Sequence, residues 1–138
     1  MTNQHLRTIT RQMMVTGLFH DEHQAIDIFQ ASLRALRNRL PKVEAYHLGT
    51  KLPLDMRDDY FANWPHNVHR QTVSVNKSEF LAEVAFHLHG HEDHSLDELV
   101  PVALNQVLRM VSENEAENVK HSLPRSMRDI FNDSISMD

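Results

Sequence analysis

This chain of 138 residues contains no cysteine and only 3 glycines. The lack of cysteine excludes disulfides, thiolate metal ligands and a cysteine nucleophile. So few glycines disfavour a sheet-rich fold, because tight turns between strands often require them. No apolar run approaches the roughly 18 residues of a membrane span, and no basic segment followed by an apolar stretch marks a signal peptide. We therefore expect a cytoplasmic protein that does not associate with membranes.

A basic surface is also missing, because 14 lysines and arginines face 19 aspartates and glutamates, for a formal net charge of −5. Sequence-independent binding to nucleic acid is not expected, since phosphate contacts need a basic surface. Histidine, in contrast, occurs 11 times. Imidazole titrates near neutral pH, so the net charge should reverse between about pH 7 and pH 5, with a change in solubility or self-association.

The second half of the chain repeats the first at a constant offset, which carries Pro53 onto Pro124. The segment 52–58, Leu-Pro-Leu-Asp-Met-Arg-Asp, recurs at 123–129 as Leu-Pro-Arg-Ser-Met-Arg-Asp. Apolar residues at spacings of three and four match between the copies, which predicts amphipathic helices. We expect an all-α single domain over residues 1–138, built from two pseudo-symmetric units of three to four helices each. These units, 6–61 and 77–132, would share one core and be joined by a connector, 62–76.

The longest helix of each unit is predicted at about 21–39 and 95–110, with shorter helices before and after it. Leu33 and its match Leu104 lie in the middle of the apolar stripes, so both should be buried. Asp21 and Ser112 precede a Gln and a Glu by three positions, which is typical of helix N-caps. Pro101 should kink the second long helix or delay its start.

The pattern resembles the family catalogued as domain of unknown function 2267. The resemblance is carried by segments 31–41, 44–49, 51–53 and 80–85 and by Tyr60-Phe61 followed by Trp64. It implies a small bacterial or archaeal all-helical protein and carries no activity. Asn63 and Pro65 flank Trp64 where family members tend to have Gly and Asp. The histidine pairs described next are not part of the family pattern.

Three histidine pairs have the spacing His-x-x-His: His20 with His23, His66 with His69, and His91 with His94. Imidazole and carboxylate are ligands for zinc or nickel, and the matched loops of two repeats could pool four histidines: His20, His23, His91 and His94. Against this, the acids beside them are explained as helix caps, and the positive end of a helix opposes a bound cation. We favour the interpretation that these histidines are ordinary polar loop residues with adventitious binding of nickel or zinc, and a specific metal site stays an alternative.

For two further groups of residues we favour a structural role over a binding role. Glu44 and Arg57 recur as Glu115 and Arg128, and we expect each Arg to hold the last helix of its unit by pairing with the Glu of that unit. A symmetrical binding site made from these duplicated charges is the alternative. Tyr60, Phe61 and Trp64 form the second group, either as a plug between the units or as an exposed surface for a partner.

The organised residues of this sequence are packing residues, so we predict a non-enzymatic interaction or assembly module that binds a protein partner or itself. A metal- or pH-responsive binding protein that uses the histidine pairs is the alternative. An enzyme is least supported, because no Ser or Thr has an evident His partner and the isolated glycines match no phosphate-binding loop.

Overall fold

The computed structural model describes residues 4–62, 76–88, 96–123 and 125–132. These ranges contain eight helices and no strand, as expected for an all-α fold. We call α1–α4 the first half and α5–α8 the second half. The helices are α1 (Gln4–Met14), α2 (Glu22–Arg39), α3 (Lys42–Lys51), α4 (Leu54–Phe61), α5 (Lys77–Phe86), α6 (Leu96–Arg109), α7 (Glu113–His121) and α8 (Arg125–Asn132).

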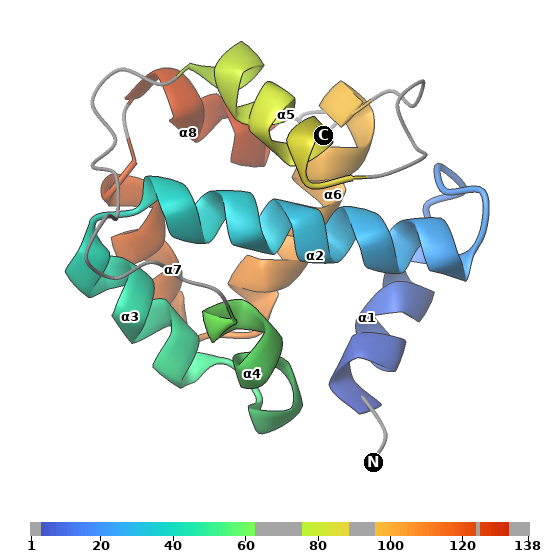
Figure 1. Ribbon diagram of the computed structural model, residues 1–138, viewed down its shortest axis with the longest axis horizontal. Coiled ribbons are helices and arrows are strands. Elements are labelled where there is room, and N and C mark those ends of the chain that lie inside the picture. The colour runs from blue at the N-terminus through green and yellow to red at the C-terminus, as the bar shows by residue number, and fades with distance from the viewer. Residues whose placement is uncertain (1–3, 63–75, 89–95, 124, 133–138) are drawn as a thin grey trace.

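The two long helices, α2 and α6, pack directly against each other at the centre of the molecule (Figure 1). In this view α5 and α8 lie above α2, while α1 and α4 lie below it. Within each half the first and last helices touch, α1 with α4 and α5 with α8. The halves meet again where α3 contacts α7. One hydrophobic cluster draws side chains from both halves, so the halves share a core.

The apolar stripes predicted from the sequence form this core. Leu33 on α2 and Leu104 on α6 are 2% and 0% exposed, so their predicted burial is confirmed. Helix α8 begins and ends at the positions that the sequence repeat matches to the ends of α4. Helix α6 runs from Leu96 through Pro101 to Arg109. The residues before Leu96 lie outside the described ranges, so the expected kink or delayed start stays a prediction.

Side-chain caps set the N-terminal ends of α2, α5 and α7. The carboxylate of Asp21 accepts a 2.8 Å hydrogen bond from the backbone of Gln24, as predicted. Ser112 caps α7 by accepting from the backbone N–H of Glu115 at 3.1 Å. None of the helices in the described ranges is long and apolar enough to cross a membrane.

Candidate functional site

The contact between α3 and α7 places two carboxyl groups against each other. Glu44 lies in the first turn of α3 and Glu115 in the first turn of α7, and their side chains are within hydrogen-bonding reach of one another. Glu115 is only 5% exposed. The Oε2 atom of each glutamate is buried and has no hydrogen-bond partner among the described residues. We call Glu44 and Glu115 the acid pair.

Burial and the neighbouring carboxyl group make ionisation of the acid pair unfavourable. Loss of hydration, followed by the hydrogen bond and the charge of Glu115, raises the pKa of Glu44 to about 7. Two carboxylates in contact cannot both ionise at low cost, so Glu44 keeps its proton to a higher pH than an isolated glutamate. The acid pair therefore changes its charge near neutral pH.

Tyr60 on α4 lies close to the acid pair but serves the fold. Its hydroxyl donates a 2.6 Å hydrogen bond to the backbone carbonyl of Ala45, which ties α4 to α3. The side chain is fully buried, and this burial raises the pKa of its phenol. Tyr60 is therefore a core residue. It cannot be part of the exposed partner surface that was one of the two predictions for Tyr60, Phe61 and Trp64.

The first predicted arginine–carboxylate pair is not formed. The guanidinium of Arg57 donates to the backbone carbonyls of Thr50 at 2.7 Å and Leu52 at 2.9 Å. These carbonyls belong to the C-terminal end of α3, where they lack partners within the helix and the helix dipole is negative. Glu44 lies in the first turn of the same helix, at the opposite end, so a direct pair with Arg57 is wrong.

The matched arginine of the second half behaves in the same way. Arg128 donates to the carbonyls of His121 at 3.3 Å and Lys120 at 3.2 Å, at the C-terminal end of α7. His121 occupies the position in the repeat that Thr50 occupies in the first half, so the two arginines share a matched acceptor. Both arginines hold the last helix of their half, as predicted. They do so by hydrogen bonds to backbone carbonyls, and neither Glu44 nor Glu115 takes part.

A second polar cluster, which the sequence did not single out, joins α2 to α5. Glu83 accepts hydrogen bonds from Arg39 Nε at 2.6 Å and from Asn38 Nδ2 at 3.0 Å, and His87 Nε2 lies 3.7 Å from its Oε2. Burial by itself would raise the pKa of Glu83, but contacts with His87, Asn38 and Arg39 lower it below its usual value. Met110 stands at the matched position of Arg39, so no repeated polar residue marked this cluster.

The structure describes only part of the predicted metal set. The backbone N–H of His20 donates to Gln24 Oε1 at 2.6 Å. The side chain of His23 is 80% exposed, and its Nε2 lies 3.4 Å from Asp27. His91 and His94 lie outside the described residues. Among the residues that are described, no three His, Asp or Glu side chains gather as a metal site would require. The four-histidine site therefore stays a prediction.

Phe61 is the second predicted aromatic, and it covers the outer side of α3. Its ring centroid lies 5.0 Å from that of Tyr60 and 5.9 Å from that of Tyr46. A Cβ atom on Gly49 would overlap the Phe61 ring, so glycine allows the ring to approach the helix. Phe61 remains partly exposed. Trp64, the third aromatic, lies outside the described residues.

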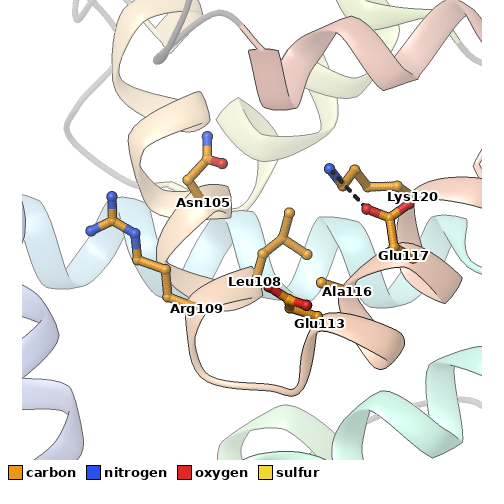
Figure 2. A pocket seen from close by; sticks show the side chains of 7 residues that line it. All are labelled: Asn105, Leu108, Arg109, Glu113, Ala116, Glu117 and Lys120. Atoms are coloured by element: carbon orange, nitrogen blue, oxygen red, sulfur yellow. Dashed lines mark ion pairs between the residues drawn. The ribbon is translucent and has the colours of Figure 1, made fainter.

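A pocket of about 450 Å³ opens between α6 and α7 (Figure 2). Leu108 rises at its centre, with Asn105 and Arg109 on one side and Glu117 and Lys120 on the other. Lys120 Nζ lies 3.7 Å from Glu117. The remaining lining residues are Glu113 and Ala116. We call this the α6–α7 pocket.

Residues 6–130 match a family described as an uncharacterized conserved protein. The chain belongs to the DUF2267 family. The match covers most of both halves, and it confirms the resemblance carried by the helical pattern. No curated protein matches the chain. The DUF2267 description assigns no activity, so any function must be argued from the acid pair, the polar clusters and the surface of this chain.

Proposed function

We propose that the protein is a non-enzymatic interaction module made of two related helical units, 6–61 and 77–132. Its docking surface would be the outer side of α3. Val43 is 71% exposed and Tyr46 is 53% exposed, and they lie one turn apart on this helix. The Tyr46 ring lies beside the partly exposed Phe61. We call Val43, Tyr46 and Phe61 the α3 surface, and this cluster of exposed apolar groups is the observation that carries the proposal.

The other large exposed apolar side chains give a useful contrast. Val15 and Leu18 follow α1, Leu54 begins α4, and Phe86 ends α5. Single exposed apolar residues of this kind are normal on soluble proteins and need no explanation. The α3 surface differs because neighbouring side chains on α3 and α4 combine into one patch, with two aromatic rings in contact.

The matched helix of the second half supports a role beyond packing. In the sequence repeat, the α3 surface corresponds to Asn114, Glu117 and Asn132. A helix of this type therefore accepts polar residues at all three positions. Because exposing apolar area to water is unfavourable, the exposed side chains of Val43 and Tyr46 do not stabilise the folded monomer. Contact with a partner gives them a function.

Site-specific photo-crosslinking tests this proposal in cells that express the protein. A photoreactive amino acid replaces Val43 in one variant and Glu98, an exposed residue in the first turn of α6, in the control. We expect defined protein adducts from position 43 and none from position 98. Equal labelling at both positions, or no adducts at either, would contradict an interaction role for the α3 surface. Mass spectrometry of the adduct identifies the partner chain.

A pH-responsive binding protein is the second candidate, and the acid pair favours it. The pKa of Glu44, at about 7, lies where small changes of pH alter its charge. The pair sits at the contact between α3 and α7, so its ionisation acts on the association of the halves. Partner binding by the α3 surface that weakens above pH 7 in the wild type, but not in Glu44→Gln, would support this candidate. Identical profiles would contradict it.

A further inference from the structure

The α6–α7 pocket occupies the place that aromatic and arginine side chains fill in the first half. Its residues Leu108, Glu117 and Lys120 correspond in the repeat to Arg37, Tyr46 and Gly49. In the first half the Phe61 ring lies against two of these positions, beside the Tyr46 ring and over Gly49.

The third position, Arg37, is filled by a side chain that binds the chain on either side of Phe61. It donates to the carbonyls of Tyr60 and Ala62 at 2.7 and 3.3 Å. At the matched position of Phe61 the second half has Asn132, which is smaller and polar. The second half has no aromatic of its own at this position, and its pocket is open beside Leu108, where the first half has Arg37. Lys120 stands where Gly49 admits the Phe61 ring, so a ring that enters this pocket must lie toward Leu108 and not over Lys120.

We propose that the α6–α7 pocket binds the α3 surface of a second copy of this chain, with the Tyr46 ring entering beside Leu108. This inference rests on the proposed interaction function and names the partner. Tyr46 is not among the residues that line the pocket of its own chain, so its ring is available to another copy. A pocket of about 450 Å³ is within the size range of sites that take a small ligand or a side chain.

The exposed charges of the two helices are complementary. Lys42 and Lys51 flank the α3 surface, and both are exposed. The pocket presents Glu113, which is exposed and has no ion-pair partner among the described residues. At the same position in the repeat, α3 carries Lys42 where α7 carries Glu113. Opposite charges at the contact steer two copies into this orientation.

The remaining polar groups of the pocket suit an aromatic ring. Arg109 is exposed, and in Figure 2 its guanidinium extends away from Leu108. Its side chain must turn toward the pocket before the guanidinium can stack on the face of a tyrosine ring. Lys120 already lies 3.7 Å from Glu117, so it does not compete with the lysines of the incoming copy for Glu113. Leu108 and Ala116 are the apolar residues of the pocket lining.

The α3 surface and the pocket lie on different halves, so the contact joins copies head to tail. Each copy keeps one unused surface or one unused pocket after a first contact, and higher oligomers should follow at higher concentration. A variant with a damaged α3 surface still has an intact α6–α7 pocket, and a variant with a damaged pocket still has an intact α3 surface. The two kinds of variant should therefore rescue each other in a mixture, which an interface between identical patches would not allow.

Sedimentation velocity over a concentration series from micromolar to submillimolar tests this with three variants that exchange a residue for its match in the other half. Tyr46→Glu removes the ring and introduces the residue found at 117, and Glu113→Lys introduces the residue found at 42. Leu54→Arg is the control, because it removes an exposed apolar side chain outside the α3 surface and introduces the residue found at 125. Each variant carries a residue that the other half already accepts, and circular dichroism verifies that it is folded.

We expect concentration-dependent association of the wild type and of Leu54→Arg. Association should be weakened at least about tenfold in Tyr46→Glu and in Glu113→Lys. An equal mixture of these two variants should form dimers and nothing larger, since one surface and one pocket remain intact in the pair. Wild type that stays monomeric at the highest concentration, or a mixture that does not associate, would overturn the inference. Adducts from position 43 with another protein would then leave the interaction function standing without self-assembly.

Discussion

The two halves satisfy the same backbone carbonyl with different side chains. In the first half Arg37 of α2 reaches the carbonyl of Tyr60 at 2.7 Å, near the end of α4. In the second half Asn105 of α6 donates to the carbonyl of Phe131 at 2.9 Å, at the matched position of α8. Asn105 corresponds to Arg34, one turn before Arg37. The backbone requirement is therefore fixed by the fold, while the side chain that meets it can move along the long helix.

This exchange has a consequence for the surface. In the first half the buried Arg37 fills the space beside Phe61. In the second half Asn105 makes the hydrogen bond from one turn earlier, and Leu108, at the matched position of Arg37, lines the α6–α7 pocket. This is one difference between the halves at matched positions of the long helices. In contrast, many buried apolar residues of the two halves match in the sequence repeat. Substitutions at matched positions can show which differences matter for stability.

The largest expected effect tests the similarity of the halves. Leu33→Ala and Leu104→Ala each remove a buried side chain from the centre of a long helix, and each should lower the free energy of unfolding by about 2–5 kcal/mol. Urea unfolding followed by circular dichroism measures this loss. A value below about 1 kcal/mol at either position would mean that the two stripes do not contribute equally to one core.

The burial of Leu33 and Leu104 was predicted from the sequence and is found in the structure. Apolar periodicity and N-caps depend on neighbours within one helix, so the helices and their buried faces could be predicted from residues three and four apart. The DUF2267 resemblance followed from the same local patterns. These features depend little on how the halves are placed relative to each other.

The acid pair and the glutamate cluster depend on that placement. Glu44 and Glu115 were singled out because they repeat, but the repeat cannot show that they meet each other across α3 and α7. Arg57 was expected to pair with a carboxylate, yet the carbonyls at the end of α3 were closer. The partners of Glu83 do not recur in the second half, where Arg109 and Met110 match Asn38 and Arg39. The sequence repeat therefore does not mark this cluster.

The next prediction compares the two side chains that hold the last helices. Arg37→Ala breaks two backbone hydrogen bonds and leaves a cavity at a buried position, so it should cost about 2–3 kcal/mol of stability. Asn105→Ala removes the hydrogen bonds of one neutral amide, to Pro101 and to Phe131 of α8, from a partly exposed residue and should cost about 1 kcal/mol. Chemical unfolding of both variants checks the order. Equal losses would mean that the arginine contributes no more than the shorter asparagine does.

The acid pair predicts an effect of pH on stability. The pKa of Glu44 is raised to about 7, above its ordinary value, so the folded state holds the proton more tightly than the unfolded state. The resulting stabilisation is full below about pH 4.5 and is lost as the pH rises through about 7. Because Glu44 is partly exposed, screening by solvent reduces the loss to about 1–2 kcal/mol.

Glu44→Gln isolates this contribution, since glutamine cannot ionise. The variant should be more stable than the wild type at pH 8 by about 1–2 kcal/mol, and the advantage should shrink toward pH 4.5. Glu98→Gln, an exposed first-turn substitution on α6, is the control and should show no gain in stability at pH 8, because it removes an acid that the positive end of the helix favours. Taking differences from the wild type removes the contribution of histidine titration. A constant difference across the range would show that the carboxyl groups do not share a proton.

The smallest effect concerns the matched arginines at the ends of α3 and α7. Arg57 donates to its two carbonyls at 2.7 and 2.9 Å, whereas Arg128 donates at 3.3 and 3.2 Å. Shorter hydrogen bonds from a cation to helix-terminal carbonyls are stronger, so Arg57→Met should cost about 1 kcal/mol and Arg128→Met about half of that. Methionine keeps much of the apolar stem in place, so the comparison reports mainly on the charged group. Urea unfolding at pH 7 and low salt measures both variants. A larger loss at Arg128 would reverse the comparison and indicate that α8 depends on its arginine more than α4 does.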